Sequence, residues 1–393
     1  MGTATAGCGP LGDLAGPRWE GTVDTAANGV TLVRNPATPV LDSGAVHLER
    51  LWSDPVDPEL LDAPVWEAGP ALSVSDSSVY LLDRTGGRVR VFRAADGTPH
   101  GGWPTSAPGG RDSLFTLVSV PGRVVVGAHR ELEVFPSDGS DVHRIRTEGN
   151  VRNLYALDDT SVVTLEMGGG GVGWGRYGVT DSVGRAYVPG EVRSRIAPDV
   201  MDVDCWKMDG GGGHFLIQAC TRPVIMVLGE DGKMTTEIGI DRPADTASAT
   251  QLDTLRALVR AKTAASDSKL PRRVLDGLVE REARRQRVAH LYRGVRYDSA
   301  SGLYAVLEQV PDFLGGSGPS RLHLLTRGGV FLATVPLPSR VEAYDVAGGT
   351  LYALLESGKS PGPLLAAYRI DLPRKVHGRS DWWEWPEKRK GDR

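Results

Sequence analysis

Acidic side chains recur in this chain at the ends of apolar stretches, where they could act together. The four acids in this position are Asp83, Glu166, Glu308 and Glu356. His129 and Gln218 hold a similar place in two further stretches, and Arg84 and Arg222 lie near by in the sequence. If the stretches are copies of one unit arranged around an axis, these side chains line the mouth of a central channel. A carboxylate ring there could hold Ca²⁺ through oxygen ligands, or attract a cationic molecule.

The same acids also have a purely structural interpretation. An acid that precedes a turn commonly accepts hydrogen bonds from the backbone N–H groups of that turn, which requires no ligand. The eight histidines show no HxH or HxxxH spacing, and the chain has no GxSxG, P-loop or CxxC pattern. The sequence therefore leaves a ligand ring and turn caps open, and favours a non-catalytic protein over an enzyme.

The elements that must position these residues are short strands joined by tight turns. An apolar strand at Val79–Asp83 is followed by a Gly-Gly turn, a second strand at Arg88–Phe92 and a turn at Asp96-Gly97. Turn glycines then recur at Gly139, Gly184 and Gly232, in steps of 42, 45 and 48 residues. Blades of β-propellers repeat at about 40 to 50 residues. Fifty Gly and 26 Pro in 393 residues agree with many turns.

This rhythm predicts an all-β, six-bladed β-propeller. The blades are expected at residues 66–105, 112–147, 150–192, 199–240, 291–338 and 340–371. The last blade lacks its outermost strand, and Gly21–Asn35 reads as a hairpin with an Asn-Gly turn. We expect this N-terminal strand to complete the last blade and close the ring, since an open edge invites aggregation. Five prolines within 36–65 argue against sheet there.

Residues 241–289 interrupt the rhythm between blades four and five. Leu252, Leu255, Leu258 and Val259 have helical spacing, and Pro271 opens a second apolar-faced segment. We expect a helical hairpin packed on the propeller, on the face that carries the turns between second and third strands. It is either a structural cover or a platform for a partner.

The two ends of the chain lie outside the predicted propeller, which spans 19–371. Residues 1–18 are expected to form a flexible segment, and 372–393 a basic tail rich in tryptophan. The tail either docks on the propeller or contacts a partner or a membrane surface.

The segment 66–110 resembles the NHL-type six-bladed β-propellers, whose repeats carry the pattern of Val79–Asp83, Arg88–Phe92 and Gly97. Val33–Ala37 looks like the lead-in of bacterial members, which are often exported or lipid-anchored. The resemblance implies the propeller fold. Enzymes with this architecture include lactonases and amidating lyases, but their metal ligands and catalytic residues have no matching pattern in this chain.

The three cysteines are the residues that could indicate the cellular compartment of the protein. Thr5–Cys8 resembles a lipobox, in which Cys8 would be acylated, although no apolar segment precedes it. With a lipid anchor the protein is periplasmic or on the cell surface; without one it is cytoplasmic. Cys205 and Cys220 flank Gly210–Gly213 symmetrically and form either a disulfide across a hairpin or two buried thiols.

The net charge and the hydropathy of the chain limit the kinds of partner that we expect. The net charge of −4 gives no basic field for nucleic acid, and no apolar run of 18 residues exists. We therefore expect a monomeric binding propeller that engages a protein or glycan on the face of the insertion, with contact to a membrane only through a lipid anchor. Ca²⁺ is the one cofactor considered. The alternative is a metal-dependent hydrolase or lyase with its site at the channel mouth.

Overall fold

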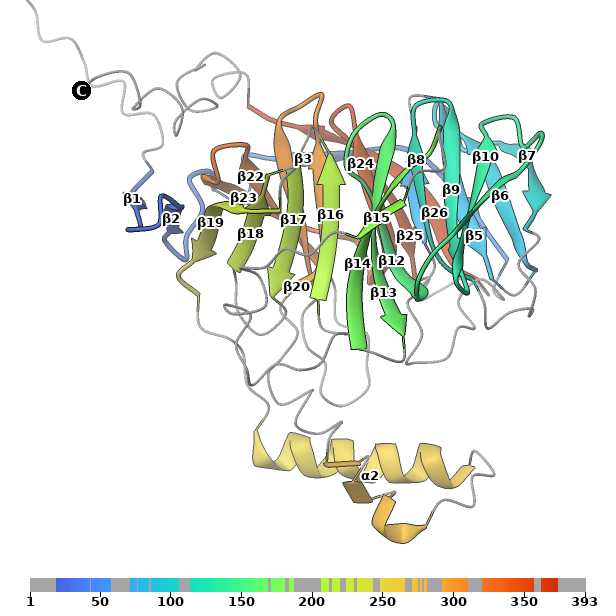
Figure 1. Ribbon diagram of the computed structural model, residues 1–393. Helices are drawn as coiled ribbons and strands as arrows, with labels where there is room; N and C mark the ends of the chain where they lie inside the picture. Colours follow the sequence, from blue (N-terminus) through green and yellow to red (C-terminus); the bar gives the residue numbers. More distant parts are fainter. Residues whose placement is uncertain are drawn as a thin grey trace, which may run out of the picture.

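The computed structural model describes most of the chain between residues 19 and 373. The described residues are 19–42, 44–57, 71–75, 77–84, 86–105, 114–168, 171–180, 184–186, 206–211, 214–219, 224–229, 232–242, 248–265, 271–274, 276–277, 279–280, 292–309, 320–356 and 362–373. They form six sheets arranged as a β-propeller, and the four strands of each blade are antiparallel, which confirms the predicted fold class (Figure 1).

The first three blades follow the chain from the inner to the outer strand. Blade one holds β4 (Leu72–Val74), β5 (Ser78–Asp83), β6 (Arg88–Arg93) and β7 (Pro99–Pro104). Blade two holds β8 (Leu114–Val120), β9 (Arg123–Ala128), β10 (Glu131–Pro136) and β11 (His143–Arg146). Blade three holds β12 (Asn150–Ala156), β13 (Ser161–Gly168), β14 (Gly171–Gly178) and β15 (Gly184–Ala186).

The last three blades differ in how their outer edges are finished. Blade four holds β16 (Trp206–Gly211), β17 (His214–Ala219), β18 (Val224–Leu228) and β19 (Met234–Ile240). Blade five holds β20 (Tyr292–Asp298), β21 (Leu303–Gln309), β22 (Ser320–Thr326) and β23 (Phe331–Pro336). Blade six takes only three strands from the end of the chain, β24 (Val341–Ala347), β25 (Thr350–Leu355) and β26 (Leu364–Asp371).

The fourth strand of blade six is β3 (His47–Pro55), which pairs antiparallel with β26. The predicted hairpin does form, as β1 (Thr22–Thr25) and β2 (Thr31–Asn35), but β2 pairs in parallel with β19 of blade four. The prediction that this hairpin completes the last blade is therefore wrong, and so is the prediction that 36–65 contains no sheet. Pro55 stands at the end of β3, so the strand before it is uninterrupted and its edge position tolerates the proline.

Residues 22–55 thus run along the outer edges of three blades. Between β2 and β3, the N–H groups of Val40 and Leu41 donate to the carbonyls of Phe331 and Leu332 on blade five. Asn35 is buried and joins the segment to two blades at once. Its amide nitrogen donates to the carbonyls of Gly239 (3.1 Å) and Gly329 (2.8 Å), and its oxygen accepts from the Phe331 N–H (2.8 Å).

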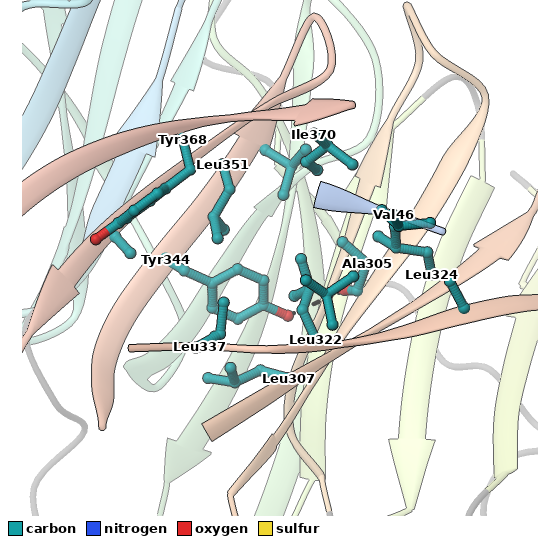
Figure 2. Packing of buried hydrophobic residues seen from close by; sticks show 14 of the residues in the cluster. Val46, Ala305, Leu307, Leu322, Leu324, Leu337, Tyr344, Leu351, Tyr368 and Ile370 are labelled. Atoms are coloured by element: carbon teal, nitrogen blue, oxygen red, sulfur yellow. Dashed lines mark hydrogen bonds between the residues drawn. The ribbon is translucent and has the colours of Figure 1, made fainter. Parts of the chain in front are cut away.

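The core lies between neighbouring blades, because successive side chains of each strand point to opposite faces. Between blades five and six, Leu307, Leu322 and Leu351 pack around the ring of Tyr344 (Figure 2). The Tyr344 hydroxyl donates to the Ala305 carbonyl at 3.1 Å, so the one polar atom of this side chain is satisfied inside the cluster.

The turn glycines that mark the blades meet the neighbouring blade directly. Gly97 and Gly139 both have φ of 75°, in the left-handed region that favours glycine. A Cβ at Gly97 would lie 2.4 Å from the ring of Trp52 on β3, and a Cβ at Gly139 would lie 2.6 Å from Trp103 on β7. Each of these turns therefore seats a side chain from the outer strand of the preceding blade.

The insertion contains α2 (Ala249–Ala265) and a second helical stretch whose described residues lie within 272–280. Arg256 pairs with Glu280 (3.0 Å) and Arg260 with Asp276 (3.5 Å), a spacing that sets the two segments antiparallel. Figure 1 shows α2 beyond the ends of the strands, on the side where the inner strands begin. That this pair packs on the propeller stays a prediction. No helix among the described residues is long and apolar enough to cross a membrane.

Replacing Gly97 by alanine should destabilise the fold by about 2 to 4 kcal/mol, since left-handed strain adds to a clash with Trp52. Gly122 is the matched control, because it also has positive φ but a Cβ there meets nothing within 4 Å. G122A should lose only about 1 to 2 kcal/mol. Urea unfolding of the three proteins measures both changes, and equal losses would mean that the Trp52 contact has no effect.

Removing residues 1–36 should leave a folded monomer that is less stable by about 3 to 6 kcal/mol, through the loss of the buried Val30 and Val33. Removing residues 1–56 should instead yield aggregated protein, because β26 is then an open edge. Size-exclusion chromatography and circular dichroism distinguish the two. A soluble, folded product of the longer deletion would show that β3 does not close the ring.

Candidate functional site

The six inner strands stand next to one another around the ring, and three of them bring opposite charges together. Asp209 comes from β16, Arg296 from β20 and Asp345 from β24, so blades four, five and six contribute one residue each. Arg296 Nη1 lies 3.5 Å from Asp209 Oδ1, and Arg296 Nε lies 3.6 Å from Asp345 Oδ1. We call these three residues the axial cluster.

The axial cluster also ties each blade to the next through the backbone. Asp209 Oδ2 accepts the N–H of Tyr297 on blade five, and Asp345 Oδ2 accepts the N–H of Val74 on blade one, both at 2.8 Å. Arg296 Nε donates to the carbonyl of Tyr344 on blade six at 3.2 Å. The carboxylates therefore have a structural task whether or not a ligand binds.

A similar bond joins blades one and two. The hydroxyl oxygen of Ser73 on β4 accepts the N–H of Ser119 on β8 at 2.9 Å. The Ser119 hydroxyl in turn donates to the Val74 carbonyl at 2.8 Å. Inner strands of neighbouring blades belong to different sheets and share no backbone pairing. Hydrogen bonds from their polar side chains to the neighbouring backbone join them instead.

Electrostatics set the axial cluster apart from an ordinary ion pair. Burial raises the pKa of Asp209 to about 7, an effect that Arg296 opposes and the charge of Asp345 reinforces. Burial also raises the pKa of Asp345, again against Arg296. The Asp209, Arg296 and Asp345 side chains keep 12%, 26% and 17% exposure, so solvent reaches them. A carboxyl group that titrates near neutral pH can donate or accept a proton.

Asp83 and Glu166 of the predicted ring each have hydrogen-bond or ion-pair partners of their own. Asp83 is buried, accepts the Gly86 N–H at 2.7 Å and pairs with Arg90 at 2.6 Å, as expected for an acid that caps a turn. Glu166 accepts the Gly149 N–H (2.8 Å) and the Tyr177 hydroxyl (2.6 Å).

Glu308 belongs to a polar network at the base of the insertion. Its Oε2 lies 2.8 Å from His323 Nε2 and 2.9 Å from Arg242 Nη1. His323 Nδ1 in turn lies 2.9 Å from the Thr334 hydroxyl. Burial raises the pKa of Glu308, but the hydrogen bond to His323 and the charge of Arg242 outweigh it and lower that pKa overall.

The remaining predicted residues are scattered. Glu356 follows β25, Arg84 is buried at the end of β5, and His129 is exposed in the turn after β9. Arg222, Cys8, Cys205 and Cys220 lie outside the described residues. Within the part of the chain that the structure describes, no group of three His, Cys, Asp or Glu is placed so that it could hold a metal ion.

Sequence reasoning missed the axial cluster altogether. The signal for it was present, because Asp209, Arg296 and Asp345 are each a charged residue in the middle of an inner strand. Aligning the six inner strands, rather than the more regular second strands, would have placed them at one level of the channel.

Comparison with known proteins agrees on architecture. No model of a known protein family matches the sequence, and no curated protein matches it significantly. Among solved structures, a member of the duf4221 family from Bacteroides vulgatus aligns with a TM-score of 0.52 at 10% identity, over 84% of this chain and all of that one. A streptogramin B lyase aligns with a TM-score of 0.44 at 8% identity, over 84% of this chain and 99% of that one. The likeness to the duf4221 member concerns the fold alone.

Asp209→Asn should flatten the pH dependence of stability. Because the folded pKa of Asp209 is raised to about 7, its contribution is complete below pH of about 4 and is lost as the pH rises toward 7. For the wild type this group lowers the free energy of unfolding by up to about 1.4 kcal/mol per pH unit in that window.

Urea unfolding between pH 4.5 and 8 provides the test, with Asp24→Asn on the exposed strand β1 as control. The control should keep the wild-type slope. An unchanged slope in D209N would show that Asp209 titrates normally.

Proposed function

We propose that this protein is a non-catalytic binding propeller that engages a protein or glycan partner on the face carrying the helical insertion. The observation that carries the proposal is the ordered helical pair, which is held by its own ion pairs and stands beyond the ends of the strands (Figure 1). Such a unit presents surface to a partner while the wheel supplies the rigid base.

The described surface of the insertion has the features of a docking surface. Arg272 and Arg273 are exposed and stand beside Val274, whose side chain is 47% exposed. An apolar side chain flanked by guanidinium groups suits a partner that offers carboxylates, because arginine binds them in bidentate geometry. Acidic glycans and acidic protein surfaces both meet this requirement.

The place where the insertion leaves the wheel supports the same proposal. Arg242, the second residue after β19, is bonded to Glu308 at 2.9 Å, and Glu308 is held by buried His323. The chain therefore leaves blade four from a fixed point. We further propose that the protein works outside the cytoplasm, on the strength of the lipobox-like segment at Cys8.

A second candidate is catalysis in the channel, by a hydrolase or lyase with or without a metal ion. One observation favours it: Asp209 has a pKa near 7 beside a charged arginine, which suits a general acid or base. Metal analysis of the purified protein, together with turnover of ester and lactone substrates that D209N abolishes, would move the assignment to this candidate.

Replacing residues 246–288 by a short Gly-Ser linker should leave the unfolding temperature of the wheel within a few degrees of wild type and abolish partner binding. The partner is first identified by cross-linking in the source cells and then titrated as a purified protein or glycan. A double variant, Arg260→Asp with Asp276→Arg, is the matched control, since it restores that ion pair with reversed polarity and should bind as the wild type does. Partner binding that survives the replacement would contradict the proposal, and collapse of the wheel would identify the insertion as a structural cover.

A further inference from the structure

The helical insertion differs in charge from the rest of the chain. Residues 246–288 hold ten basic and five acidic residues, a net charge of +5. The other 350 residues hold 35 basic and 44 acidic ones, a net charge of −9. The two parts therefore carry charge of opposite sign, and the resulting field attracts acidic molecules to the insertion and repels them from the rest of the protein.

The described acids of the insertion are already paired within it. Arg256 lies 2.8 Å from Asp253 and 3.0 Å from Glu280, and Arg260 lies 3.5 Å from Asp276. These three acids are all that the structure describes between residues 248 and 280. The contacts that hold the two helical segments together thus engage every described acid of the insertion.

Arg272 and Arg273 take no part in this pairing. Both are exposed, and neither side chain forms an ion pair or a hydrogen bond with a residue that the structure describes. They lie in the opening turn of the second segment, where the Val274 N–H donates to the Pro271 carbonyl at 2.8 Å. The first turn of a helix carries partial positive charge, so arginines there weaken the helix. The stability of the insertion therefore does not explain them.

Val274 adds an apolar surface beside the two arginines. It is 47% exposed, and the other large apolar residues exposed in the described structure, Leu51 and Val142, belong to the wheel. Arginine next to an apolar side chain is typical of protein–protein interfaces. An acidic polysaccharide offers carboxylates with few apolar groups, whereas an acidic protein segment offers both.

We propose that the insertion binds an acidic segment of a partner protein, which places carboxylates on Arg272 and Arg273 and an apolar side chain on Val274. This inference rests on the proposed function and specifies the partner within it. The negative charge of the rest of the protein repels the same partner, so binding is confined to the insertion.

Two synthetic peptides test the proposal on the full chain. One is Glu-Glu-Leu-Glu-Glu-Leu-Glu-Glu, and the other has serine in place of leucine. Fluorescence anisotropy in 50 mM NaCl should show binding of both, with the leucine peptide about fivefold tighter through its apolar contact. Raising NaCl to 300 mM should weaken both by about tenfold, because salt screens exposed charges. Val274→Ser should remove the difference between the two peptides.

Arg272→Glu combined with Arg273→Glu is the decisive variant. It should fold as the wild type does, since acids are favoured in the first turn of a helix, and bind the leucine peptide about tenfold more weakly or not at all. The matched control is Arg93→Glu with Arg327→Glu, which changes the net charge equally. These two arginines are exposed where the third strands β6 and β22 end, on the side of the wheel away from the insertion (Figure 1). The control should bind within about twofold of the wild type, because salt screens charge over that distance.

Four results would overturn the proposal. If neither peptide binds the wild type, or if the double variant binds as well as the wild type, Arg272 and Arg273 do not recognise carboxylates. If polygalacturonate or phosphatidylglycerol vesicles bind more tightly than the leucine peptide, the partner is a glycan or a membrane. If sedimentation shows self-association that the double variant removes, the insertion binds a second copy of this chain.

The partner found by cross-linking separates this inference from the proposed function. If that partner is lost when a linker replaces residues 246–288 but is kept by the variant with glutamate at both arginines, the proposed function stands and the acidic-segment inference is wrong. If the linker variant keeps the partner, both are wrong.

Discussion

Closure of the wheel depends on the backbone hydrogen bonds between β3 and β26, which give blade six its outer strand. Blade six has three strands of its own, and only β3, from nearly three hundred residues earlier, supplies the fourth. The same segment covers blade five through Val40 and Leu41 and blade four through β2. Unpaired edge groups would otherwise recruit another chain. Asn35 fixes this segment on the rim, because its one buried amide forms hydrogen bonds with both blade four and blade five.

Closure at the rim makes a second set of bonds possible at the axis. Neighbouring blades are separate sheets, so no backbone hydrogen bonds pair their inner strands. Side chains of the inner strands instead form hydrogen bonds with the backbone of the neighbouring blade. Where these side chains are Asp209, Arg296 and Asp345, the joint is charged and mostly withdrawn from water. Withdrawal raises the pKa of both acids, although the arginine between them opposes it. The axial cluster is therefore a structural joint that also holds two carboxyl groups with raised pKa.

Blades four and five flank the helical insertion, which carries the proposed function. The insertion joins them, Arg242 and Glu308 fix its start, and Gln218 breaks a position that is leucine in three other blades. The predicted acids Asp83 and Glu166 are regular by comparison, since each is bonded within its own blade or to the turn beside it.

The number of blades, their limits and the turn glycines Gly97, Gly139 and Gly232 could be predicted from the sequence, because they follow from local rules, whereas Gly184, expected in a turn, begins strand β15. Gly97 and Gly139 adopt positive φ in turns that few other residues allow, and short alternating strands connect them. The insertion was also visible as a break in that rhythm. The closing strand was predicted at the wrong segment, since both 22–35 and 47–55 can form strands and only the path around the rim decides which edge each one reaches. The axial cluster required the tertiary structure for the same reason: its residues are tens of residues apart, and they meet only because radial packing brings equivalent levels of different blades together.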